Sequence, residues 1–124
     1  MLVRLFDNYA MTPMQAIVGD ALRPDDQRDA FGVERARGML DTAYDWWDRR
    51  MRSREWAAGD AFSLADCAAG PSLFYADWAH PIGDQFPQLA AYRARLLTRP
   101  SVRRCVDEAR PYRRFFPLGA PDRD

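Results

Sequence analysis

The 124-residue chain carries 18 basic and 18 acidic side chains, so its formal net charge is zero. This balance provides no overall attraction toward nucleic acid or an acidic membrane surface. The length suits one domain, the apolar fraction of 48% is typical of a folded protein, and no apolar run is long enough to span a bilayer. We therefore expect a single cytoplasmic domain with no nucleic-acid partner and no membrane partner.

The sequence favours helices throughout. Val, Ile and Thr are scarce, and no segment of useful length alternates apolar with polar residues, so the predicted fold is all-α. The first helix should run from Leu2 to Leu22 and kink at Pro13, because proline lacks the backbone N–H and clashes with the preceding turn. The helix has two apolar stripes and should bury both. One stripe is Leu2, Phe6, Tyr9, Pro13 and Ile17, and the other is Met11, Met14, Val18 and Leu22.

A second helix is predicted from about Val33 to Ser53, after a loop rich in Pro, Asp and Gly. Its polar side carries three aspartates and three arginines, namely Arg37, Asp41, Asp45, Asp48, Arg49 and Arg52. Three carboxylates on one face could bind a metal ion, but each lies four residues from an arginine. That spacing is typical of a solvated face with ion pairs worth about 0.2–0.5 kcal/mol each, so we expect no metal site here.

Three further helices complete the prediction. The first of them, from Leu64 to about Trp78, is apolar around its whole circumference, so it should be buried on all sides, with a bend at Gly70-Pro71. The next two should span about Pro87 to Leu97 and about Val102 to Ala109.

The C-terminal end of the chain is rich in proline and charge. We expect its aromatic residues to pack back on the helices as anchors, namely Tyr112, Phe115 and Phe116. Residues 1–116 would then form the domain, and residues 117–124 a flexible tail.

No residue of the chain makes a convincing catalytic centre. Ser63 or Cys67 would need a neighbouring base, and the only histidine, His80, should lie roughly 20 Å from Cys67 at 1.5 Å of helix rise per residue. Cys67 is better explained as a small buried apolar residue. One histidine and two distant cysteines fit neither a zinc pattern nor a disulfide framework, and no nucleotide-binding loop is present. We therefore expect no catalytic residue, no metal and no cofactor in this chain.

The segment from Arg93 to Arg114 contains eight arginines, and such an excess could bind an anion or nucleic acid. Arg103 and Arg104, however, lie one helical turn before Asp107 and Glu108. Ion pairs at that spacing are typical of a solvated face, which is the favoured interpretation, with anion binding as an alternative.

Ser63 and Asp66 have the spacing of a helix capping box. The Ser63 hydroxyl can accept the backbone N–H of Asp66, while the Asp66 carboxyl accepts the backbone N–H of Ser63. Phe62, just before the cap, can pack on Cys67 as a hydrophobic staple. We interpret these residues as the start of a buried helix rather than as a ligand site.

The segment WAAGDAFSLADCAAGPSLFYADW, followed by FPQLAAYRARLLTRPSVRRCVDEAR, resembles the C-terminal all-helical domain of bacterial cytosolic glutathione S-transferases. Ser63 and Asp66 match that family's capping box, and the resemblance is specific from about Glu55 to Phe116. It implies a bundle of about five helices. Family members also carry an N-terminal thioredoxin-like domain that binds glutathione, and this chain supplies none of its strands.

The resemblance therefore implies half of an enzyme. The chain would form the wall for a hydrophobic co-substrate and the subunit contacts, with Asn8, Tyr9 and Thr12 at the wall. Glutathione would be a substrate only with a thioredoxin-like domain, so we expect the chain to be inactive alone. Its partners would be a hydrophobic small molecule and either a second copy or a thioredoxin-like domain. The alternative is a non-catalytic module for ligand binding or dimerisation that exposes the stripe from Met11 to Leu22.

Overall fold

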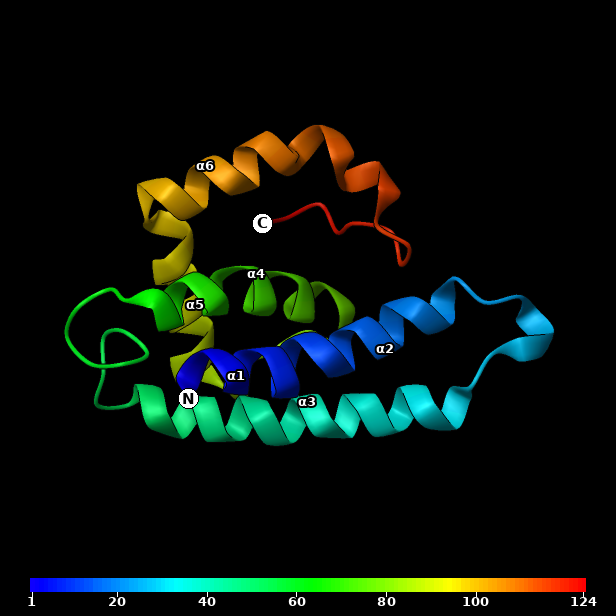
Figure 1. The fold of residues 1–124 in the computed structure, drawn as a ribbon, viewed down its shortest axis with the longest axis horizontal. Helices are drawn as coiled ribbons and strands as arrows, with labels where there is room; N and C mark the ends of the chain where they lie inside the picture. Colours follow the sequence, from blue (N-terminus) through cyan, green and yellow to red (C-terminus); the bar gives the residue numbers. More distant parts are fainter.

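The computed structural model describes residues 1–124 and consists of helices joined by loops (Figure 1). The elements, in chain order, are α1 (Leu2–Phe6), η1 (Asp7–Met11), α2 (Thr12–Ala21), η2 (Asp25–Gln27), α3 (Ala30–Met51), α4 (Leu64–Ala79), α5 (Pro87–Thr98), α6 (Pro100–Ala109) and η3 (Arg110–Phe115). There is no β-strand, and the predicted all-α bundle is confirmed. None of the helices is both long and apolar enough to cross a membrane.

The helices pack in layers around α1, η1 and α2, which follow one continuous path. In Figure 1 this path lies between α3, to which α2 is antiparallel, and α4. α5 contacts α3, α4 and α6, while α6 runs in the same direction as α4. α4 therefore lies between the N-terminal path and α6, and it contacts α1, η1, α2 and α5.

The first predicted helix differs from expectation in the turn before Pro13. The chain stays helical from Leu2 to Ala21, but η1 is a π-helical turn, which is one residue wider than an α-turn. Pro13 cannot donate a hydrogen bond to the preceding turn, and its ring crowds the carbonyl there, so a wider turn relieves the conflict. The Asp7 carbonyl accepts both the backbone N–H of Thr12 and the Thr12 hydroxyl, the latter at 3.0 Å.

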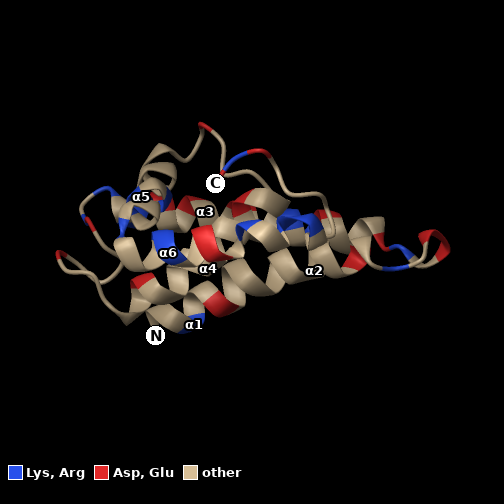
Figure 2. Cartoon of the chain, turned by 90° about the horizontal axis from the view of Figure 1, so that it is seen from above, with Lys and Arg blue, Asp and Glu red and all other residues tan.

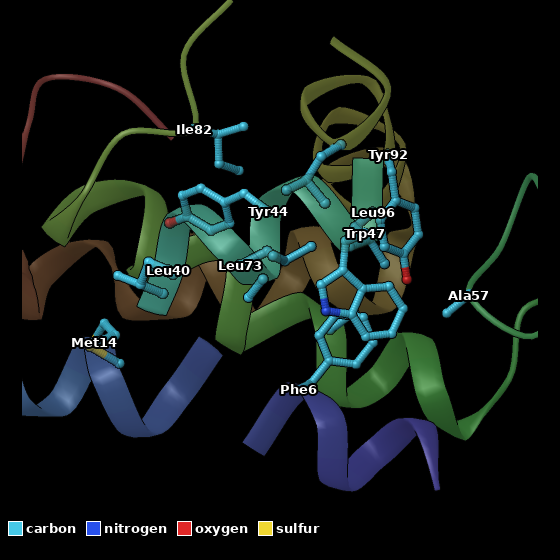
Figure 3. Packing of buried hydrophobic residues seen from close by; sticks show 14 of the residues in the cluster. Phe6, Met14, Leu40, Tyr44, Trp47, Ala57, Leu73, Ile82, Tyr92 and Leu96 are labelled. Carbon is cyan, nitrogen blue, oxygen red and sulfur yellow. The ribbon is translucent and has the colours of Figure 1, made fainter. Parts of the chain in front are cut away.

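The main core is a cluster of buried residues from α1 to α5 and the loops that carry Ala57 and Ile82 (Figure 3). Its centre is the stack of Phe6 on Trp47, with ring centroids 3.9 Å apart and planes at 10°. Leu40, Leu73 and Leu96 are also fully buried there. Their burial follows from apolar residues at helical spacing, as the sequence predicts.

A second cluster joins α4 to α6. Phe74, Trp78 and Val106 form it, and Phe116 packs against it. The two helices also come close at Gly70, where an added Cβ would lie 3.9 Å from a methyl of Val102. The predicted aromatic anchors are only partly correct, because Phe116 packs on Trp78 whereas Tyr112 and Phe115 are each 65% exposed.

α4 is not buried on all sides, contrary to the prediction. It runs unbroken through Pro71, and one stripe of it is exposed: Leu64, Cys67 and Pro71. Cys67 is a free, exposed cysteine, so its interpretation as a buried residue was wrong. An apolar sequence cannot show which neighbour covers each face, and no helix fully covers this face of α4.

The stripe from Met11 to Leu22 is mostly covered, as expected for a helix that buries two faces, and not exposed as the alternative of a dimerisation module requires. Met14 is buried, and Met11 and Val18 are half-buried against the core, which leaves only Leu22 largely exposed. The stripe packs within the bundle, so it is not a surface for a second copy.

The last two residues of the chain form ion pairs with the helices. Arg123 forms an ion pair with Asp77 of α4, and the Asp124 side chain contacts Arg103, Arg110 and Arg113. The sequence predicts a flexible tail over residues 117–124 because it shows only proline and charge; the fold provides partners for those charges.

Candidate functional site

One apolar cavity of the molecule lies between the N-terminal helical path and α3. It has a volume of about 430 Å³, and its lining is mostly apolar. The lining residues are Leu5, Tyr9, Met39, Thr42, Ala43, Trp46 and Trp47. We call this cavity the Tyr9 pocket. Its volume falls within the range of small-molecule sites in proteins.

Aromatic packing shapes the Tyr9 pocket. Trp47 is 1% exposed and is held against Phe6, so it forms a rigid part of the lining. Trp46 stands edge-on to Trp47, with centroids 4.7 Å apart, and is 42% exposed. A planar apolar ligand could stack here without moving the core, because aromatic pairs favour offset and edge-on arrangements.

Only one of the three predicted ligand residues lines the pocket. Tyr9 lines it and is 50% exposed. Asn8 is exposed but does not line it, and Thr12 uses its hydroxyl to bond the Asp7 carbonyl. The Thr42 hydroxyl likewise donates to a backbone carbonyl, that of Gly38, at 3.0 Å. Of the hydroxyl groups near the pocket, the Tyr9 hydroxyl is therefore the one available to a ligand.

A second apolar cavity lies between α4 and α6 and has a volume of about 420 Å³. Its lining comprises Phe62, Cys67, Gly70, Pro71, Phe74, Tyr75, Ser101, Val102, Cys105, Val106 and Ala109. We call it the α4–α6 groove. It continues the exposed stripe of α4, and the two free cysteines of the chain both line it. This arrangement could not be predicted from the sequence, because the two thiols lie on helices that meet only in the fold.

The residues predicted to start the central helix are assembled at the beginning of α4. The Asp66 carboxyl accepts the backbone N–H of Ser63 at 2.8 Å, and the Ser63 hydroxyl accepts the N–H of Ala65 at 3.3 Å. Together they make a reciprocal capping box. Phe62 packs edge-on against Trp56, and the Arg99 guanidinium lies over its ring at 4.0 Å. This arrangement provides a helix start and no ligand site.

Asp66 also does more than the sequence predicts. It is fully buried, and its Oδ1 accepts both the backbone N–H of Ala57, at 2.8 Å, and the hydroxyl of Tyr92, at 2.6 Å. Burial and the hydrogen bond to Asp66 raise the pKa of Tyr92 well above its usual value. Asp66 thus connects the loop before α4 to α5, through two partners that are distant in sequence.

The polar side of α3 is not simply the solvated face that was predicted. Asp45 pairs with Arg49, as expected, at 2.5 Å. Asp48, however, is 5% exposed, and its Oδ1 accepts the backbone N–H groups of Gln88 and Leu89 at 2.7 and 3.0 Å. It therefore caps the start of α5, whose own preceding residue makes no side-chain cap.

The single histidine joins α3 to the end of α4. His80 Nε2 lies 2.7 Å from Asp41 Oδ1, and His80 Nδ1 lies 3.3 Å from an Arg37 nitrogen. Because arginine only donates, Nδ1 accepts from Arg37 and the Nε2–H donates to Asp41. Both ring nitrogens thus join α4 to α3, and His80 does not line the Tyr9 pocket.

The comparisons with known proteins identify the family. A family model described as "Glutathione S-transferase, C-terminal domain" matches residues 30–95, which is more than half of the chain. The chain belongs to the glutathione S-transferase C-terminal domain family. The curated glutathione S-transferase A of Pleuronectes platessa is 32% identical over 82 residues, covering 64% of this chain and 36% of the relative.

Two solved glutathione S-transferases also resemble this domain. The enzyme of Methylobacillus flagellatus, solved with GSH bound, is 27% identical, with a TM-score of 0.68. The enzyme of Methylobacterium radiotolerans, solved with glutathione sulfonate, is 28% identical, with a TM-score of 0.67. Each match covers 82% of this chain, but only 53% and 49% of the respective relative. The glutathione S-transferase C-terminal domain described here therefore spans about half of these relatives.

Proposed function

We propose that the chain supplies the helical half of a glutathione S-transferase, in which it contributes the wall for a hydrophobic co-substrate. The single observation that carries this proposal is the Tyr9 pocket, an apolar cavity of about 430 Å³ on a domain of this family. Its aromatic lining suits an aryl electrophile, and the Tyr9 hydroxyl can donate a hydrogen bond to a polar substituent. Conjugation with glutathione would need the thioredoxin-like half.

The thioredoxin-like half would dock on the α4–α6 groove. The exposed stripe of α4 is apolar, with Leu64 74% exposed, and soluble proteins rarely leave a continuous apolar surface uncovered. The matches cover only about half of each solved relative named above, so those relatives contain a further portion that could cover the groove. On this proposal the groove is a domain contact and the Tyr9 pocket is the ligand site.

The tryptophan indole N–H signals offer a direct test of the ligand site. Of the four tryptophans, Trp46 and Trp47 line the Tyr9 pocket, whereas Trp56 and Trp78 do not. We expect titration with 1-chloro-2,4-dinitrobenzene to shift the NMR signals of the first pair and leave the second pair in place. Y9A should weaken binding by about five- to tenfold through loss of one aromatic contact, and the matched control Y112A should not.

Two results would contradict the proposal. Equal shifts at all four tryptophans, or none at Trp46 and Trp47, would remove the Tyr9 pocket as the co-substrate wall. Conjugation of glutathione by the isolated chain at enzymatic rates would show that it needs no thioredoxin-like half.

A second candidate function is a non-catalytic module that dimerises. Tyr9, Met39 and Trp46 are exposed apolar side chains around the Tyr9 pocket, and a second copy could cover them. Sedimentation equilibrium distinguishes the candidates: a dimer that W46E dissociates favours the module, and a monomer that binds the aryl electrophile favours the co-substrate wall.

A further inference from the structure

The last side chain of the chain lies in a cluster of arginines. Asp124 Oδ2 accepts from Arg103 at 2.9 Å and from Arg110 at 2.7 Å, while Oδ1 accepts from Arg113. The hydrogen bonds from Arg110 and Arg113 hold the pKa of the Asp124 carboxyl well below its usual value. We call Arg103, Arg110 and Arg113 the arginine cradle. The predicted solvated face is thus only part of the arginine-rich segment.

The arginine cradle is held in place without help from Asp124. Asp107 lies between two of its members, 2.9 Å from Arg110 Nε and 3.5 Å from Arg103 Nε. Arg113 lies over the ring of the buried Trp78, with its guanidinium carbon 5.2 Å from the centroid. Guanidinium groups positioned in this way lose less conformational freedom when they bind an anion.

The tail that carries Asp124 has a separate anchor. Arg123 pairs with Asp77, whose other oxygen accepts the backbone N–H of Ile82 at 2.9 Å. Asp77 is 8% exposed and also lies 3.5 Å from Arg93. The tail can therefore stay near the arginine cradle when the Asp124 carboxyl leaves it.

Asp124 does not fill the binding capacity of the arginine cradle. A carboxylate has two oxygens for three guanidinium groups, so Oδ2 must serve two arginines. A phosphate monoester has three terminal oxygens and could face one guanidinium with each. The charges agree with this count. Without Asp124, the three arginines of the cradle remain beside the single carboxylate of Asp107, and the net charge of two positive units matches a phosphate dianion.

Basic and acidic residues are otherwise interspersed over the molecule (Figure 2). Arg104, for example, pairs with Glu108 at 2.7 Å, as the sequence predicts. The convergence of three arginines on one carboxylate is thus a local feature, and it favours a small anion over a long polyanion, which needs an extended basic surface.

We propose that the arginine cradle is a binding site for a phosphate monoester, occupied within the chain by the Asp124 carboxylate. Asp124 is an intrinsic competitor, so the site binds its ligand weakly until the tail is displaced or neutralised. This inference is independent of the co-substrate wall and of the α4–α6 groove, because none of the three arginines lines either cavity.

The test compares the affinity of inorganic phosphate for the 124-residue chain and its variants by isothermal titration calorimetry at constant ionic strength. D124N removes the competing charge and keeps the size of the side chain. If Asp124 occupies the cradle nine-tenths of the time, its removal should tighten phosphate binding by about tenfold. The matched control is D122N, which makes the same charge change at an exposed residue of the tail.

Two further variants assign the effect to the arginine cradle. D124N/R110A should lose the gain in affinity, whereas D124N/R104A should keep it, because Arg104 pairs with Glu108 outside the cradle. Dimethyl phosphate, a diester with a single charge, should bind D124N much more weakly than phosphate; equal binding would point to nucleic-acid backbones instead. The proposal is overturned if D124N binds phosphate no more tightly than D122N does, or if R110A leaves the gain intact.

A measurement on the unaltered chain covers the case in which a variant is unstable. Phosphate, but not chloride at equal ionic strength, should shift the NMR signal of the Asp124 amide as the carboxyl leaves the cradle. No shift at high phosphate concentration would argue against the site.

Discussion

At the scale of single residues, Asp66 shows how a local motif acquires a long-range role. Its spacing from Ser63 is enough to predict a helix start, and that bond is present. The same carboxyl also accepts from Ala57 and Tyr92, which lie nine and 26 residues away. Because the group is fully buried, each of these donors depends on it for a hydrogen bond.

We expect D66A to lower the free energy of unfolding by about 3–5 kcal/mol, because it leaves several buried donors without a partner. S63A should cost only about 0.5–2 kcal/mol, as expected for the loss of one cap. Urea unfolding followed by circular dichroism measures both changes. Equal costs for the two variants would mean that Asp66 acts only as a local cap.

At the scale of elements, α5 depends on a residue of another helix for its start. Phe86 precedes α5 and offers no side-chain acceptor, whereas Asp48 of α3 accepts from two N–H groups of the first turn. An acceptor at this position satisfies orphan donors and favours the positive end of the helix dipole. α3 and α5 are therefore joined at a defined register.

We expect D48A to destabilise the protein by about 2 kcal/mol, since a cap is worth about 1 kcal/mol and these donors are shielded from water. D45A is the matched control on the same helix. Asp45 and Arg49 are both more than half exposed, so the loss of their ion pair should change stability by less than about 0.5 kcal/mol. Thermal unfolding can compare the two, and similar melting temperatures would refute the capping role of Asp48.

At the scale of the whole molecule, the helical bundle leaves the apolar stripe of α4 exposed beside the α4–α6 groove. The α4–α6 groove has two free thiols in its lining, and both cysteines are exposed. Thiol reactivity therefore reports whether a partner covers the groove. This property comes from the fold, because Cys67 and Cys105 lie on different helices.

We expect both thiols to react with Ellman's reagent in the isolated, folded chain, and a purified glutathione-binding thioredoxin-like domain to protect them. L64E should abolish that protection, because it places a charge on the exposed stripe. It should leave stability within about 0.5 kcal/mol, since Leu64 is largely exposed. Thiols that stay reactive in the presence of the domain would place the docking surface elsewhere, and protection that persists in L64E would show that Leu64 is not part of that surface.

The sequence alone determined the helical class and most helix boundaries, because apolar spacing, prolines and the Ser63–Asp66 cap act over one or two turns. It also indicated the family, since the capping segment is contiguous. Other features depend on which helices come into contact, so only the tertiary structure could determine them. Asp48 caps α5, Cys67 is exposed, and Tyr9 lines a pocket that Asn8 does not line. Similarly, only the fold brings Asp124 to the arginine cradle. A side chain's neighbours along the chain determine its local geometry, whereas its burial and its distant partners depend on the packing of the whole bundle.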